Sequence, residues 1–256
     1  MTLLITIPVY GQHEYTHALV EDLEREGADY VIVDNRGDYP KLGNEQVIRP
    51  GENLGWGGGS ELGFRTGFSD GYDRVMTLNN DTRISKGFVA ALLDSRLPGD
   101  AGLIGPVYDD AIAFKEMLAD YDGPAADYIP VPHYRKLSVL DGTALVLTRE
   151  AWRKVGGLDL RSFGRYGWAA SLDLILRVKL AGFGIYATEM AFINHFGRKT
   201  AHAEFGRHRY YLGGKLEVRR GMRRIHGRHW QRELTSDPVI FDLADSTQGF
   251  SRWPAK

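Results

Sequence analysis

The 256-residue sequence predicts an α/β fold with a mostly parallel central sheet and helices on both faces. Three observations lead to this prediction. Strand-like and helix-like segments alternate along the first half of the chain, turn-forming residues separate them, and a glycine run opens one of the helices. Strands that are joined through helices run parallel, because the helix carries the chain back to the starting edge of the sheet.

The first half supplies these strands and helices in regular order. We expect strands at 3–9, 30–33, 47–48 and 74–78, and helices at 13–26, 60–68 and 86–93. Ser85 is placed to cap the third of these helices. This repeated strand-helix-strand order is typical of a parallel sheet.

The second half is less regular. We expect strands at 103–108, 184–187 and 191–195, a helix at 170–180, a loop at 120–132, and a β-like run at 137–147 that Asp141-Gly142 interrupts. A basic helical segment follows at 204–232, and the tail after Thr235 shows no period. The chain is therefore expected to form one domain over 1–203 and a basic helical C-terminal extension with a tail over 204–256.

The composition excludes several classes of function. With 43% hydrophobic and 25% charged residues and a net charge of −1, the chain has no global attraction to nucleic acid or anionic lipid. It has no cysteine, which excludes a disulfide framework, a thiolate metal site and a cysteine nucleophile. The apolar stretch 3–10 contains Pro8 and is too short to span a bilayer. We therefore expect a cytoplasmic protein.

Polar residues gather where the predicted parallel strands end. Asn79-Asn80-Asp81 follows one strand, and Asp34 follows another. Open α/β sheets bind nucleotides in the crevice at the carboxyl ends of their strands. Asp81 there offers a hard oxygen ligand for a divalent cation on a diphosphate. These positions predict a nucleotide-dependent transferase, although Asp34 can also be read as a simple Asp-Asn turn residue.

Eight motifs carry a resemblance to a known family. They are Ile7-Pro8-Val9-Tyr10, Val31-Ile32-Val33-Asp34-Asn35, Glu52-Asn53-Leu54-Gly55-Trp56-Gly57-Gly58-Gly59, Leu78-Asn79-Asn80-Asp81-Thr82, Asp141-Gly142-Thr143-Ala144-Leu145-Val146-Leu147, Gly156-Gly157-Leu158-Asp159, Asp173-Leu174-Ile175-Leu176-Arg177 and Asn194-His195-Phe196-Gly197. In this order the chain resembles the inverting family 2 glycosyltransferases with the GT-A nucleotide-sugar-binding fold, especially the rhamnosyl- and galactofuranosyl-transferase-like branch. The resemblance implies inverting transfer of a sugar from a nucleoside-diphosphate-sugar donor to an acceptor hydroxyl.

The same resemblance implies roles for individual residues. The donor site would be shaped by Pro8, Tyr10, Asp34, Asn53, Gly55, Trp56, Asn79, Asn80 and Asp81. Asp81 and His195 would hold Mn²⁺ or Mg²⁺, which would act on the leaving diphosphate. Trp168 and Asp141 would lie near the acceptor, which is open among a glycan, a protein, a lipid-linked molecule and a small molecule.

One position departs from the family's pattern. Relatives commonly carry an acidic residue that accepts the acceptor's proton, and Ser171 stands at that position here. Asp173 is the first candidate to replace it, and Asp141 is the second. Two alternatives stay open: a nucleotide-sugar-binding protein with weak or no turnover, or Ser171 as a substitution made to disable the enzyme.

A zinc motif competes with this interpretation. His13-Glu14-Tyr15-Thr16-His17 matches H-E-x-x-H, in which two histidines bind zinc and the glutamate activates water. The motif directly follows the first strand of an α/β pattern, and no third ligand stands out. A zinc hydrolase is therefore ranked third, and solvent-facing helix residues are the favoured interpretation of the motif.

The basic segment also has two interpretations. Between residues 207 and 232 the chain carries nine lysines and arginines against the single acidic residue Glu217, with Tyr210, Tyr211 and Trp230 interleaved. This pattern predicts either a solvated helix that packs through Leu212, Leu216 and Ile225, or a surface that contacts the acceptor, a membrane or nucleic acid.

Overall fold

A computed structural model describes residues 1–109, 114–163, 168–196 and 207–252, without the side chains of 168 and 207–212. The strands are β1 (Leu3–Val9), β2 (Asp29–Asp34), β3 (Gln46–Ile48), β4 (Arg74–Leu78), β5 (Thr82–Ile84), β6 (Ala101–Tyr108), β7 (His133–Lys136), β8 (Ala144–Thr148), β9 (Gly184–His195), β10 (Val239–Asp242) and β11 (Gly249–Phe250). The α-helices are α1 (His13–Glu26), α2 (Gly55–Ser69), α3 (Phe88–Leu92), α4 (Arg149–Val155), α5 (Trp168–Leu180) and α7 (Arg207–His226). Short 3₁₀ turns are η1 (Lys115–Met117), η2 (Ala125–Asp127) and η3 (Trp230–Leu234).

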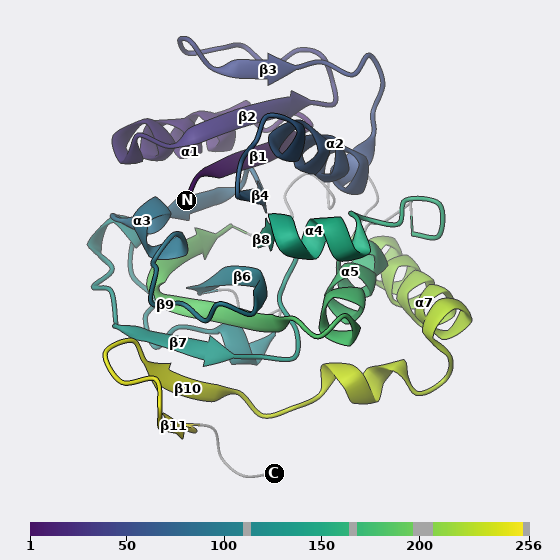
Figure 1. The fold of residues 1–256 in the computed structure, drawn as a ribbon. Helices are drawn as coiled ribbons and strands as arrows, with labels where there is room; N and C mark the ends of the chain where they lie inside the picture. The colour runs from purple at the N-terminus through teal and green to yellow at the C-terminus, as the bar shows by residue number, and fades with distance from the viewer. Residues whose placement is uncertain (110–113, 164–167, 197–206, 253–256) are drawn as a thin grey trace.

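In the described residues these strands form one mixed sheet. Its order is β3-β2-β1-β4-β8-β6-β9-β7-β10-β11, and β5 pairs with β9 beside this path. Figure 1 shows the sheet running from β3 at the top to β11 at the bottom, with α5 and α7 packed together at one side. The large sheet flanked by helices confirms the predicted α/β class.

Parallel pairing is confined to two parts of the sheet. β3, β2, β1 and β4 are parallel. The central residues of β1, β2 and β4 are buried, which explains their continuous apolar runs, whereas β3 lies at the edge and is only half-buried. β6 and β9 are also parallel. By contrast, β8 runs antiparallel to both β4 and β6, and β7, β10 and β11 are antiparallel as well. The expectation of a mostly parallel sheet is therefore correct only for the first half.

The connection between β6 and β8 explains this difference. A parallel return needs a crossover of a dozen or more residues, usually a helix. The described residues between these strands contain only the turns η1 and η2 and the strand β7. Without a crossover helix, β8 enters the sheet in the opposite direction to its neighbours.

The β-like run predicted at 137–147 is a strand only from Ala144 (β8), and the two strands predicted at 184–187 and 191–195 are one strand (β9). Three further local predictions fail. Ser85 does not cap α3, because its Oγ accepts a hydrogen bond from the Phe192 N–H (3.0 Å), and Gly87 in a left-handed conformation precedes the helix. α2 begins at Gly55 and not at residue 60, since the glycine run is already helical. The tail after Thr235 forms β10, which pairs with β7. The division at residue 203 stays a prediction, although β10 joins the sheet of the first part.

The position of α2 is set by glycines that let it approach the sheet closely. A Cβ at Gly63 would lie 2.1 Å from Thr6 Cγ2 of β1, and one at Gly67 would lie 2.6 Å from Val75 Cγ2 of β4. The contact places the amino-terminal turn of α2 beside the carboxyl ends of these strands. No helix in the described ranges is long and apolar enough to cross a membrane.

We expect Gly63→Ala to lower the free energy of unfolding by about 1–3 kcal/mol, because the added methyl group overpacks the contact between α2 and β1. Gly99→Ala is the matched control, since a Cβ at that position has no atom within 4 Å. Urea denaturation of both variants and the parent protein measures the difference. Equal midpoints for the three proteins would contradict the close approach of α2.

Candidate functional site

Most of the predicted site residues meet at the carboxyl edge of the parallel strands. Val9 at the end of β1 pairs with Asp34 at the end of β2. Asn79 follows β4, and its N–H donates to the Thr143 carbonyl at the start of β8 (2.8 Å). Because β8 runs antiparallel to β4, the segment before β8 reaches the same edge as the end of β4. The structure thus brings residues 8–10, 34–35, 79–81 and 141–143 to one edge.

Asp81 and His195 face each other at this edge. Thr82 of β5 is in register with His195 at the end of β9, and the Phe196 N–H donates to the Asp81 carbonyl (3.0 Å). His195 Nε2 lies 3.5 Å from Asp81 Oδ1, and the two side chains are only 3% and 8% exposed. Two residues that the resemblance assigns to a metal are therefore adjacent in space.

Asp109 positions His195, and the sequence analysis missed it. It follows β6 directly, accepts a hydrogen bond from the His195 N–H (2.9 Å) and accepts another from the Asn194 amide (2.7 Å). An acidic residue at the end of a predicted strand was the signal used for Asp34 and Asp81. The same signal, applied to the strand predicted at 103–108, would have found Asp109.

Asp81 and His195 fit part of a divalent-cation site. A carboxylate oxygen and an imidazole nitrogen suit Mn²⁺, and the carboxylate suits Mg²⁺. Asn79 adds a buried amide oxygen that has no hydrogen-bond partner among the described residues. The described ranges contain no group of three or more His, Cys, Asp and Glu that could hold a metal ion. A cation here would therefore need oxygen ligands from a bound diphosphate or from water.

The loop that opens α2 is fixed by two asparagines. Gly55 has φ +67°, a conformation that favours glycine, and its N–H donates to Asn53 Oδ1 (2.9 Å). Asn35 accepts a hydrogen bond from the Leu54 N–H (3.2 Å) and donates to the Gly55 carbonyl (3.3 Å). Asn53 and Gly55, which the resemblance places in the donor site, thus shape the backbone beside the end of β2.

Asp34 holds the loop between β2 and β3. Its buried carboxylate accepts from the N–H groups of Gly37 (2.8 Å) and Tyr39 (2.9 Å) and from Arg49 Nε (3.2 Å). Burial alone would raise the pKa of Asp34, but these hydrogen bonds, with one from the Arg36 N–H, hold it below its usual value. Asp34 therefore stabilises this loop, and its assignment to the donor site stays a prediction.

Trp56, Gly142 and Ser171 meet on the acceptor side of the predicted site. A Cβ at Gly142 would lie 3.1 Å from Trp56 Cη2 and 3.3 Å from Ser171 Cβ. Half-buried Asp141 precedes this contact, and its Oδ1 accepts from the Thr143 N–H (2.8 Å). Trp168, the other predicted acceptor residue, begins α5, but its side chain lies outside the described residues.

Asp173 faces a different neighbour. Its Oδ2 accepts from Arg177 Nε (2.8 Å), and its Oδ1 lies 2.7 Å from His226 Nε2 on α7. Arg177 also donates to the carbonyls of Val155 (2.6 Å) and Gly157 (2.7 Å). Asp173 is 1% exposed and ties α5 to α7. Both of its oxygens are thus engaged away from the residues around Ser171, and its assignment as general base stays an untested prediction.

The two histidines of the zinc motif pack against one aromatic ring. The rings of His13 and His17 contact Tyr39 edge-on, with centroids 5.8 and 5.4 Å away. His13 Nε2 lies 3.3 Å from Asp38, and His17 Nε2 lies 2.8 Å from the Pro40 carbonyl. These half-buried histidines therefore contact the loop after β2, and among the described residues they belong to no group of three or more His, Cys, Asp and Glu that could hold a metal ion.

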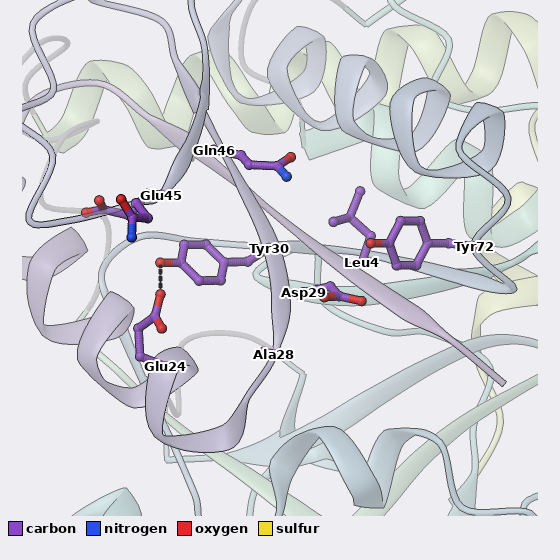
Figure 2. Close-up of a pocket in the computed structure, with 9 residues that line it drawn as sticks. Leu4, Glu24, Ala28, Asp29, Tyr30, Glu45, Gln46 and Tyr72 are labelled. Atoms are coloured by element: carbon purple, nitrogen blue, oxygen red, sulfur yellow. Dashed lines mark hydrogen bonds between the residues drawn. The ribbon is translucent and has the colours of Figure 1, made fainter.

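A small pocket lies at the opposite, amino edge of the parallel strands. Figure 2 shows it between the end of α1 and the starts of β1, β2 and β3, where Tyr30 donates a hydrogen bond to Glu24 (2.5 Å). Burial, and then this hydrogen bond, raise the pKa of Tyr30. The volume of about 170 Å³ is below the roughly 300–1,000 Å³ of typical ligand sites. This pocket therefore does not replace the carboxyl edge as the candidate site.

Two solved structures are similar to this protein in fold. The structure is similar to that of GalNAc-T7, solved with UDP, GalNAc and Mn²⁺, with a TM-score of 0.55, 12% identity and coverage of 76% of this chain and 43% of that chain. It is also similar to A197 from STIV, with a TM-score of 0.51, 12% identity and coverage of 77% and 86%. These likenesses support the GT-A-like fold and, at this identity, show the fold alone.

The sequence comparison then gives particular relatives. No protein-family model matches the chain. It is 63% identical over 227 residues to the uncharacterized proteins Rv1525 of Mycobacterium tuberculosis and Mb1552 of Mycobacterium bovis, which covers 89% of this chain and 86% of each relative. The chain belongs to the family of these mycobacterial proteins.

The lowered pKa of Asp34 predicts a pH-dependent contribution to stability. Because the pKa is lower in the folded protein than the unfolded value of about 3.9, the contribution is present above that value and is lost as the pH falls through the folded pKa. We expect Asp34→Asn to be less stable than the parent protein at neutral pH, and the difference to shrink as the pH falls below the unfolded pKa of about 3.9. Urea denaturation across this range measures the difference, with exposed Asp120→Asn as control. A constant difference at every pH would contradict the prediction.

Proposed function

We propose that the protein is a metal-dependent, inverting glycosyltransferase that moves a sugar from a nucleoside-diphosphate donor to an acceptor hydroxyl. The observation that carries this proposal is the 3.5 Å approach of His195 Nε2 to Asp81 Oδ1 at the carboxyl edge of the sheet. The GT-A-like fold and the order of the sequence motifs support the same assignment. GalNAc-T7 was solved with UDP and Mn²⁺, which supports a nucleotide donor and a divalent cation.

Each part of the edge has a role in this proposal. Asp81 and His195 hold the cation, and Asn79 contributes its amide oxygen to the cation or to the ribose. When bound, Mn²⁺ or Mg²⁺ withdraws charge from the leaving diphosphate. Pro8 and Tyr10 at the end of β1 and the loop 53–56 at the start of α2 surround the nucleotide. The amino terminus of α2 adds a favourable dipole for phosphate.

Asp141 is the general base that the geometry favours. One oxygen, Oδ1, is oriented by the Thr143 N–H, while Oδ2 has no recorded hydrogen bond in the part of the chain that the structure describes. Asp141 directly precedes Gly142, where an added Cβ would lie 3.1 Å from Trp56 and 3.3 Å from Ser171. Asp173, in contrast, has both oxygens engaged by Arg177 and His226. A base needs a free lone pair that points at the acceptor proton, and Asp141 meets this condition better.

A second candidate function is nucleotide-sugar binding with weak or no turnover. The observation that favours it is the place of Ser171, which is buried close to Gly142 at the position where the family 2 glycosyltransferases that the chain resembles commonly carry a carboxylate. A hydroxyl there cannot accept a proton unaided. Acceptor-dependent transfer separates the two functions, because a site that only binds its donor can still release the sugar slowly to water.

Nucleotide binding should depend on the cation. Since the described residues provide fewer than three titratable ligands, we expect weak Mn²⁺ binding by the protein alone and strong mutual enhancement between Mn²⁺ and one nucleoside diphosphate. Isothermal titration of a nucleoside-diphosphate panel, with and without Mn²⁺, measures both. We expect Asp81→Ala to lower the affinity for the nucleotide with Mn²⁺ by at least about tenfold.

Asp70→Ala is the control for this titration, because Asp70 is an exposed carboxylate at the far end of α2. It removes the same charge and should leave the affinity unchanged. Binding that ignores Mn²⁺, or equal losses in Asp81→Ala and Asp70→Ala, would remove the basis for the metal site. No binding of any nucleotide would overturn the transferase assignment.

Asp141→Asn separates chemistry from binding. We expect it to lower kcat by about 10²- to 10⁴-fold with little change in nucleotide affinity, because the amide keeps the shape of the carboxylate but cannot accept the proton. The assay is transfer of sugar from the donor identified by titration to a panel of glycan acceptors. Asp173→Asn is the comparison, and a larger loss of kcat there, in a protein with unchanged stability, would favour Asp173 as base. Transfer that appears only in Ser171→Asp would favour the binding-protein alternative.

A further inference from the structure

The outward direction of α7 is fixed by its contacts with the rest of the protein. Met222 is fully buried, and a Cβ at Gly221 would lie 2.1 Å from Phe163 Cε1. His226 at the end of the helix is 2.7 Å from Asp173 of α5. Figure 1 shows α7 beside α5 at the outside of the molecule. One side of α7 is therefore packed, and the other side faces solvent.

The described side chains of α7 include two exposed apolar residues, Leu216 and Ile225, and Ile225 lies on a different side of the helix from the cations. The side that carries Leu216 is strongly basic, and we call it the basic face. It consists of six exposed residues, Lys215, Leu216, Arg219, Arg220, Arg223 and Arg224. Their spacing of three and four residues places them along one side of the helix. Leu216, which is 42% exposed, lies among the cations and does not contribute to the packed side.

Among the described residues, the cations of the basic face form no ion pair with a carboxylate. Elsewhere exposed arginines pair closely, as Arg65 does with Glu61 (2.8 Å) and Arg96 with Asp94 (2.6 Å). Of the 32 lysines and arginines in the chain, nine lie within 207–232, against one of the 33 acidic residues. Arg228 and Arg232, both exposed, extend this cationic surface beyond the helix.

We propose that the basic face docks on a lipid bilayer that contains anionic phospholipids. The arginines would contact headgroup phosphates, and Leu216 would enter the boundary between headgroups and acyl chains, with the helix axis parallel to the membrane. An exposed apolar residue amid exposed cations favours a bilayer over nucleic acid, because the phosphate backbone of a duplex offers no apolar phase. The net charge of −1 restricts the attraction to this surface.

This docking goes beyond the proposed function and does not depend on it, since it uses no residue of the carboxyl edge. Vesicle co-sedimentation tests it with the full-length protein. We expect binding to phosphatidylcholine vesicles that contain phosphatidylglycerol, little binding to phosphatidylcholine alone, and a steep decrease as salt is raised. Nucleotide titration of the same proteins shows whether the donor site is intact. A failure of membrane docking can therefore be distinguished from a failure of the proposed transferase function.

Paired variants identify the surface that binds. Arg219→Glu with Arg223→Glu should lower the partition coefficient by more than about tenfold, since each basic residue near the membrane contributes roughly fivefold. Lys41→Glu with Lys86→Glu makes the same change in net charge at two exposed positions outside α7 and should have little effect. Leu216→Gln, which leaves the charge unchanged, should also weaken binding, and Leu216→Phe should keep or strengthen it. Thermal unfolding of each variant verifies that it is folded.

Three results would overturn the proposal. The first is absence of binding to anionic vesicles at low salt. The second is an equal loss in the α7 pair and the control pair, which would assign the effect to overall charge. The third is tighter binding to duplex DNA than to the vesicles, abolished by the α7 pair and unaffected by Leu216→Gln, which would assign the basic face to nucleic acid.

Discussion

The candidate site depends on the antiparallel pairing of β5 with the carboxyl end of β9. Asp81 directly precedes β5 and His195 ends β9, so these residues meet only when the two strands pair in the observed register. A slip of one residue would turn His195 to the other face of its strand. Asp109 secures the same register by accepting a hydrogen bond from the His195 main chain. Strand pairing therefore determines this site before any ligand is present.

Carboxylates in and beside the candidate site differ in whether hydrogen-bond donors engage one or both of their oxygens. A buried charge is tolerated when donors surround it, and Asp34 and Asp173 meet this condition with donors on both oxygens. Asp141 is only half-buried, and in the described residues its recorded donors reach one oxygen. The difference in partners, and not the position at a strand or helix end, separates a structural aspartate from a candidate base.

Sequence periodicity predicted β1, α1, β2 and β4 well, because these segments are apolar or amphipathic and are bounded by turn residues. It failed where contacts with distant parts of the chain determine the structure of a few residues. Examples are the predicted capping role of Ser85 and the strand β10, whose partner β7 lies about a hundred residues earlier. For the site, the resemblance brought together Asp81 and His195, which no local pattern connects. The engagement of Asp173 by His226 could not be predicted, since it depends on how α7 packs.

α5 connects the acceptor side of the site to the basic face. Ser171 and Asp173 are about 200° apart around the helix axis, so one faces Gly142 and the other faces α7. A substitution at Ser171 can therefore change the site without weakening the contact that positions α7. Loss of Asp173 would leave Arg177 and His226 without their shared carboxylate and would disturb both sides of α5. If the acceptor is carried on a membrane, this helix would fix the distance between the lipid surface and the site.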